Sequence, residues 1–151
     1  MGLQDTISSE LLAAMKSRDA VRTSTLRLLV SAFRNKEIER QKSLSDGELL
    51  EVIQGEAKRR QESIEQYRNA QRADLAAKEE AELKVLQAYL PQALSEAELQ
   101  QLVASTIQSI GAKGPQDMGK VMSALMPQIR GRADGKQAQQ KVQSLLAASK
   151  P

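Results

Sequence analysis

The chain has 151 residues, of which 40% are hydrophobic and 27% are charged, and its formal net charge is +3. It contains no Cys and no His, which excludes disulfides, thiolate metal sites, cysteine nucleophiles and the commonest general base. With one Phe, two Tyr and no Trp, it also has too few aromatic rings for recognition by stacking on unpaired bases.

Helical periodicity runs through almost the whole sequence, and no segment is predicted to be a strand. A first helix is expected over residues 3–17, with a buried face made of Leu3, Ile7, Leu11, Ala14 and Met15. Asp19 is a suitable N-cap for a second helix over residues 20–42. Its buried stripe is predicted to comprise Val21, Thr25, Leu28, Leu29, Ala32 and Phe33.

Ser45 and Glu48 form a capping box, which predicts that a long third helix starts near residue 46. A fourth helix is expected to follow the polar stretch 69–72 and to end at Pro91. Two charged runs on these helices, Lys58-Arg59-Arg60 and Glu79-Glu80-x-Glu82, are interpreted as solvated faces. A second phosphate contact stays open as the alternative for the basic run, and no metal site is expected at the acidic one.

Pro91 is followed by a second capping box, Ser95 with Glu98, so a stop signal abuts a new helix start. We therefore expect two domains, residues 1–92 and 93–151. Gly111 is expected to end a fifth helix, Pro127 a sixth, and a seventh opens near Asp134, its N-cap. The predicted fold is all-α, with an N-terminal bundle of about four helices and a small three-helix domain after it.

The excess of positive charge is confined to the C-terminal part. Residues 1–94 carry 15 basic and 15 acidic side chains, whereas residues 95–151 carry 7 basic and 4 acidic ones. Lys120, Arg130, Arg132 and Lys136 are the candidate nucleic-acid-binding residues, because basic side chains beside a helix start can hold phosphate. Arg130, Arg132 and Lys136 are expected to be exposed, and the alternative is a basic surface that only keeps the protein soluble.

Other motifs in this region are weaker. Gly131-x-x-x-Gly135-Lys136 is one residue too short for a phosphate-binding P-loop, has Gln137 in place of Ser or Thr, and follows no predicted strand. Met118, Met122 and Met126 are four residues apart and predict an apolar ridge along the sixth helix. That ridge is interpreted as core or, alternatively, as a surface for a protein partner.

Four segments together resemble the GatB/YqeY family over essentially the full length of the chain. They are Ser24–Leu29, Arg59–Arg60 with Ser63–Glu65 and Tyr67, Tyr89–Ser95, and above all Met118–Lys136. Residues 95–149 also resemble the tail domain of the B subunit of tRNA-dependent amidotransferases. The resemblance implies binding of tRNA or another structured RNA, and an aminoacyl-tRNA or amidotransferase-related protein as a possible partner.

The chemistry of the amidotransferase is not implied by this resemblance, because its kinase-like and glutaminase centres lie in other domains and subunits. We expect a non-catalytic tRNA-binding accessory protein. The family description of a carbon–nitrogen ligase with glutamine as amido-N-donor would apply to this chain only through its resemblance to the tail domain, without the activity. The alternatives are a protein–protein adaptor using the methionine ridge and the long helices, and a component of an amidotransferase complex. No catalytic residue, metal or cofactor is expected. The sequence lacks a membrane-spanning run and a signal peptide, so a cytoplasmic protein is expected.

Overall fold

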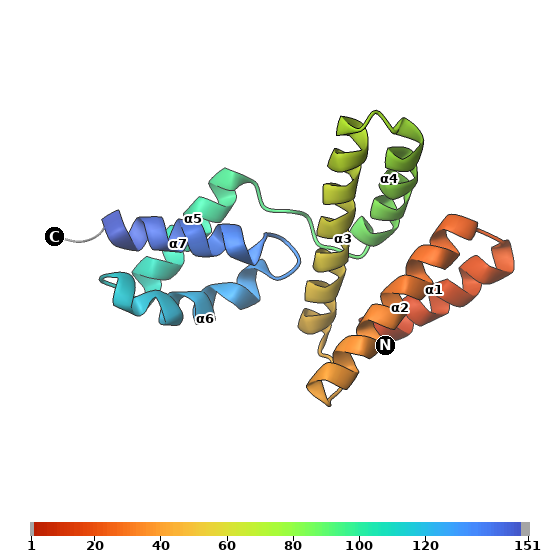
Figure 1. Cartoon of the computed structure of the whole chain (residues 1–151). Helices are drawn as coiled ribbons and strands as arrows, with labels where there is room; N and C mark the ends of the chain where they lie inside the picture. The colour runs from red at the N-terminus through yellow and green to blue at the C-terminus, as the bar shows by residue number, and fades with distance from the viewer. Residues whose placement is uncertain (1, 149–151) are drawn as a thin grey trace. The chain divides into compact units, whose positions relative to one another are not determined.

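The computed structural model describes residues 2–148, and the ends of both predicted domains, Met1 and residues 149–151, lie outside it. Within the described residues the fold is all-helical, with seven α-helices, one 3₁₀ turn and no strand (Figure 1). The chain divides into two compact units, Met1–Pro91 and Gln92–Pro151. Each unit has its own hydrophobic core.

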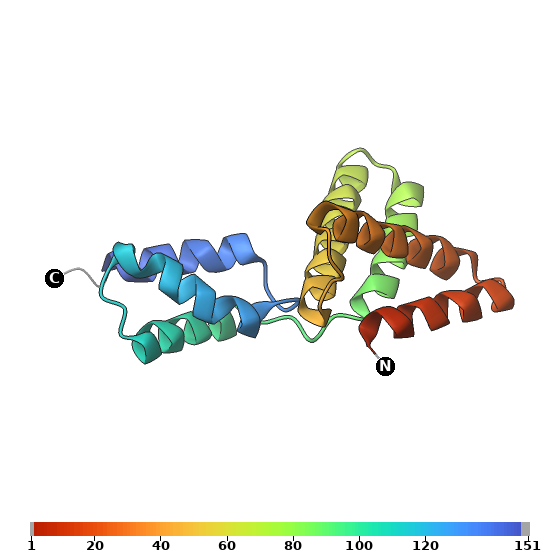
Figure 2. The ribbon, with the colours of Figure 1, turned by 90° about the horizontal axis from the view of Figure 1, so that it is seen from below.

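The first unit consists of two helical hairpins, α1 (Leu3–Ser17) with α2 (Ala20–Arg40) and α3 (Asp46–Asn69) with α4 (Ala73–Gln87). Figures 1 and 2 both show α3 and α4 side by side over the length of α4. Apolar side chains from all four helices and from the α2–α3 loop form one core, which includes Ile7, Leu26, Leu29, Phe33, Leu44, Leu49, Ile53, Ala57 and Leu86.

Side-chain caps start two of the four helices of this unit, α2 and α3, where the sequence predicts them. The Asp19 carboxylate accepts a hydrogen bond from the Arg22 N–H at 3.1 Å, and Ser45 and Glu48 form a complete capping box. These bonds satisfy backbone donors that the first turn of a helix leaves unpaired. The first two helices end on non-glycine residues in the left-handed region, Arg18 at φ 59° and Gln41 at φ 56°.

The second unit contains α5 (Glu96–Ile110), the 3₁₀ turn η1 (Pro115–Asp117), α6 (Met118–Ile129) and α7 (Gly135–Ala148). Each of the three α-helices packs against the other two around a core of Leu99, Val103, Val121, Leu125, Ile129, Ala138, Val142 and Leu146 (Figure 2). Ser95 caps α5 by accepting a hydrogen bond from the Glu98 N–H at 3.1 Å. Gly111, at φ 69°, ends the helix in the left-handed conformation that glycine adopts without a steric penalty.

Two predictions about helix ends and two about burial are corrected by the structure. Pro127 does not end α6, which continues to Ile129, a side chain that is fully buried in the core. The fourth helix ends at Gln87, before Pro91, and the N–H groups of Tyr89 and Leu90 donate to the carbonyls of Leu86 and Gln87 in tighter turns. Met15 is exposed, not buried. On α2, Val21 and Leu28 are also exposed, and Leu26 is buried instead.

Candidate nucleic-acid interface and the charged clusters

The loop between α6 and α7 is a tight turn held by its own backbone. Gly131 has φ 75°, and the N–H groups of Arg132 and Ala133 both donate to the Ile129 carbonyl, at 2.8 and 3.0 Å. The Asp134 carboxylate accepts a hydrogen bond from the Lys136 N–H at 3.4 Å, as an N-cap of α7 does. The loop therefore fixes the backbone positions of Arg130, Arg132 and Lys136.

The four predicted phosphate-binding residues differ in exposure. Lys120 and Lys136 are exposed, whereas Arg130 and Arg132 are half-buried, so the expectation of exposed side chains is wrong for both arginines. Arg132 Nε donates to the Gln92 carbonyl at 3.0 Å, and the Leu94 N–H donates to the Arg132 carbonyl at 2.8 Å. Part of the hydrogen-bonding capacity of Arg132 is therefore used to hold the start of the second unit against the loop.

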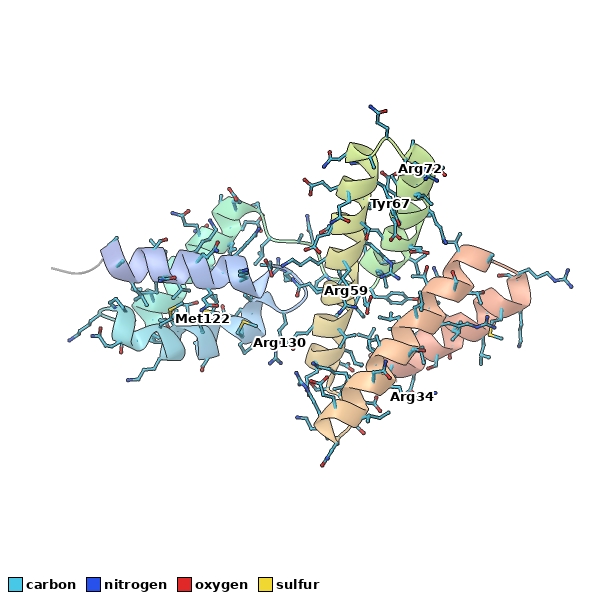
Figure 3. The ribbon with its side chains drawn as sticks, in the orientation of Figure 1. Arg34, Arg59, Tyr67, Arg72, Met122 and Arg130 are labelled. Carbon is cyan, nitrogen blue, oxygen red and sulfur yellow. The ribbon has the colours of Figure 1, made fainter. Side chains whose placement is uncertain are left out.

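Lys120 does not belong to the loop cluster. It lies in the first turn of α6, while Arg130 directly follows the last turn of the same helix. Figure 3 labels Arg130 at that end. The two residues are ten positions apart in sequence, which corresponds to about 15 Å along the helix axis. The loop turns the chain back from α6 into α7, and three of the four residues share this end of the unit. A ligand that contacts all four must span both ends of α6.

The methionine ridge on α6 is not an open surface. Met118, Met122 and Met126 are half-buried and pack against the core of the second unit. Met126 also lies beside Gly135, where an added Cβ would come within 3.8 Å of its terminal methyl carbon. The ridge thus contributes mainly to packing between α6 and the rest of its unit, as the core interpretation predicts.

A buried ion-pair cluster joins α3 to α4. Arg60 and Glu82 are only 8% and 9% exposed, so the expectation that both lie on solvated faces is wrong. Arg60 pairs with Glu56 at 3.1 Å within α3 and with Glu82 of α4 at 3.4 Å. The second contact runs through Arg60 Nε, which is within ion-pair distance but makes no hydrogen bond. Sequence reasoning missed the contact between Arg60 and Glu82 because these two residues lie on different helices.

A second cluster joins α1, α2 and the segment that follows α4. The Arg22 guanidinium donates to the Glu10 carboxylate at 2.9 Å and to the Tyr89 hydroxyl at 3.0 Å. The Tyr89 hydroxyl in turn donates to Glu10. Partial burial and this hydrogen bond to Glu10 raise the pKa of Tyr89 above its usual range. The cluster therefore holds the end of the first unit against the α1–α2 hairpin with a protonated tyrosine.

A groove of about 430 Å³ runs between α2 and α3. Its walls carry Asn35, Lys36, Glu39 and Arg40 from α2 and Glu48, Glu51, Glu56 and Arg59 from α3. Several of these charges neutralise one another: Lys36 pairs with Glu39 at 3.5 Å, Arg59 with Glu56 at 3.6 Å, and Arg40 with Glu48. The groove is consequently polar without a strong net charge.

None of the helices that the structure describes is long and apolar enough to cross a membrane.

Several known proteins are similar to the chain. One relative, named "Altered inheritance of mitochondria protein 41, mitochondrial", from Pyrenophora tritici-repentis, is 32% identical over 145 residues, covering 94% of this chain and 80% of the relative. The protein of the same name from Lachancea thermotolerans is 32% identical over 112 residues, covering 72% of this chain and 60% of the relative.

An uncharacterized protein of Schizosaccharomyces pombe is 37% identical over 90 residues, covering 60% of this chain and 73% of that protein. The mitochondrial names of the other two relatives contradict the expectation of a cytoplasmic protein, which rested only on the lack of a recognisable targeting or membrane segment. The similarity of the C-terminal part to the amidotransferase tail domain remains a prediction. Residues 4–146 match the family described as YqeY-like protein, and the chain belongs to that family.

Proposed function

We propose that the chain is a non-catalytic accessory protein that binds tRNA or another structured RNA through the second unit. The proposal is supported chiefly by the charge asymmetry: residues 95–151 supply the whole net charge of +3, and Lys120 and Lys136 of this part are exposed. Such residues attract nucleic-acid backbone by releasing its counterions. The scarcity of aromatic rings favours recognition of shape and phosphate over recognition of bases.

The half-buried arginines, Arg130 and Arg132, are less suitable than the exposed lysines for testing this proposal. Arg132 fixes residues 92–94 through its backbone and its Nε, and only the rest of its guanidinium is left for a phosphate. Substituting it would therefore change the loop together with the charge. The two exposed lysines are the cleaner test, because removing an exposed side chain of this kind changes stability by only about 0.5 kcal/mol or less.

The experiment is a titration of a folded tRNA and of single-stranded RNA of equal length, each at two salt concentrations. Lys120→Ala/Lys136→Ala should weaken tRNA binding and reduce the salt slope by roughly one unit for each phosphate that the variant no longer binds. The matched control is Lys78→Ala/Lys84→Ala, which removes two exposed lysines from α4 of the first unit and should leave tRNA affinity nearly unchanged. An unchanged tRNA affinity of the K120A/K136A variant, or no tRNA binding at low salt, would contradict the proposal.

A further inference from the structure

Helix α2 carries apolar residues in two stripes, and only one of the stripes is buried. The buried one contains Leu26, Leu29 and Phe33 and faces the core of the first unit. The other follows a regular spacing of three and four residues, and all its members are exposed: Val21, Ser24, Leu28, Ser31, Asn35 and Ile38. We call these six residues the α2 seam.

The spacing of the α2 seam is that of a coiled-coil interface. In a heptad written abcdefg, Val21, Leu28 and Asn35 occupy a positions, and Ser24, Ser31 and Ile38 occupy d positions. Its apolar side chains are 40% (Val21), 57% (Leu28) and 69% (Ile38) exposed, and they account for three of the six large exposed hydrophobic residues in the described chain. The serines between them are small, which lets another helix approach closely.

One margin of the α2 seam is basic and has no counter-charge. Arg27 and Arg34 occupy the successive g positions, and both are exposed. Among the described residues neither one has an ion pair or a side-chain hydrogen bond. The opposite margin borders the α2–α3 groove, where Lys36, Arg40 and Arg59 are already paired with glutamates. Figure 3 shows Arg34 and Arg59 on opposite sides of the α2 ribbon.

We propose that the α2 seam is a docking surface for an acidic amphipathic helix of a partner protein. Such a helix would pack apolar side chains on Val21, Leu28 and Ile38 and place carboxylates opposite Arg27 and Arg34. Charges at these flanking positions select partner and orientation in helix pairs. Asn35, a polar residue at an a position, would fix the register of the pair.

Charge and apolar content distinguish this occupant from two others. RNA backbone would meet the arginines, but it has no apolar groups with which to cover Leu28 and Ile38. A second copy of the chain packed antiparallel would bring the arginine margins together, and like charges in contact repel each other. Packed in parallel, it would place Arg27 against Ala32 and Arg34 against Glu39, a residue that already pairs with Lys36.

The test uses the full-length chain and two synthetic helical peptides of about three heptads each. Both have Leu at a and d; the first has Glu at every e and g position, and the second has Lys there. Like charges at both margins keep each peptide from pairing with itself. We expect the acidic peptide to bind the chain about tenfold more tightly than the basic one, because charges at these positions decide which helices pair.

Reversing the charge of the basic margin tests most directly whether Arg27 and Arg34 select the peptide. Arg27→Glu/Arg34→Glu should reverse the preference, so that the basic peptide binds more tightly, and circular dichroism should show an unchanged helix content. Lys78→Glu/Lys84→Glu makes the same change of charge on the exposed surface of α4 and should keep the preference for the acidic peptide. Leu28→Ser/Ile38→Ser should weaken the binding of both peptides.

Four results would overturn the proposal. They are no binding of the acidic peptide, equal binding of both peptides, a preference that survives the reversal of Arg27 and Arg34, and a peptide-free dimer in sedimentation that Leu28→Ser/Ile38→Ser dissociates. The last result would assign the α2 seam to a second copy. Loss of tRNA affinity in the Arg27→Glu/Arg34→Glu variant without any peptide binding would assign it to RNA instead. The peptide-binding and sedimentation readouts are independent of Lys120 and Lys136, which lie in the other unit.

Discussion

Arg60 shows how a single residue can hold two helices together at a cost. Its guanidinium is almost completely buried and is compensated by Glu56 on the same helix and Glu82 on the next. Removing two charges from water is expensive, and their attraction repays that cost only when the geometry is good. The Arg60 Nε, which has no hydrogen bond, indicates that the compensation in this cluster is incomplete.

This cluster leads to a prediction about stability. Arg60→Ala should lower the free energy of unfolding by about 3 kcal/mol or more, because it leaves the buried Glu82 carboxylate without its partner. The double variant Arg60→Met/Glu82→Leu removes both charges and keeps the volume, so it should be about as stable as the natural chain or more stable. Urea unfolding followed by circular dichroism measures both values. A double variant that is as unstable as Arg60→Ala would show that the ion pair itself contributes the stability.

At the scale of single elements, local signals in the sequence predicted helix starts well. Asp19, the Ser45/Glu48 box and Ser95 each make the expected capping bond, because a cap depends on residues within one turn. Pro127 predicts that α6 ends at the proline, but the helix continues to Ile129, because burial of a side chain outweighs this local signal. The side chain of Ile129 is fully buried, a gain of about 1.5–3 kcal/mol that favours helix beyond the proline.

Burial on α2 was harder to predict than its helical state. The helix has apolar residues on two faces, and periodicity alone does not say which face meets the core. Periodicity places Val21 and Leu28 in the buried stripe, whereas the core uses Leu26, Leu29 and Phe33. The burial of Arg60 and Glu82 cannot be predicted from the sequence either, because their pairing depends on how α3 and α4 are packed. The exposure of Arg130 and Arg132 was misjudged for the same reason, since Arg132 reaches the carbonyl of Gln92, which is 40 residues away in sequence.

The end of α2 leads to a second prediction. Gln41 has φ 56°, and its N–H and that of Lys42 bond back to the carbonyls of Ile38 and Glu37, which is a Schellman motif on a non-glycine residue. A left-handed conformation costs an L-residue roughly 1–2 kcal/mol, and glycine avoids this cost. Gln41→Gly should therefore raise the midpoint of thermal unfolding by a few degrees.

The control for this prediction is Gln66→Gly, at an exposed position inside α3. There the backbone is helical, so glycine should destabilise the chain by about 1 kcal/mol. Differential scanning calorimetry of both variants compares the same chemical change in two backbone conformations. A Gln41→Gly variant that melts below the natural chain would mean that the glutamine side chain contributes more than its backbone strain costs.

At the scale of the whole molecule, the two units have separate cores. No residue belongs to both hydrophobic clusters, and the first ends with Leu86, Tyr89 and Leu90 while the second starts with Leu94 and Leu99. Each unit also fixes its own side of the connection. Tyr89 bonds to Glu10 and Arg22 of the first unit, whereas Gln92 and Leu94 bond to Arg132 of the second. The short stretch between Leu90 and Gln92 is therefore the natural place to divide the chain.

We predict that fragments 1–91 and 92–151 each fold when they are produced separately. Every helix keeps its packing partners in such fragments, and the caps Asp19, Ser45 and Ser95 stay with the helices that they start. Each fragment should show helical circular dichroism and a cooperative thermal transition, and the two spectra should add up to that of the intact chain. Proteolysis gives an independent check: no Lys or Arg lies between Lys84 and Lys113, so trypsin cannot cut the connection, whereas chymotrypsin can cleave after Tyr89. A fragment 92–151 that is unfolded alone, or a chymotryptic digest without a stable C-terminal piece, would show that the second core depends on the first.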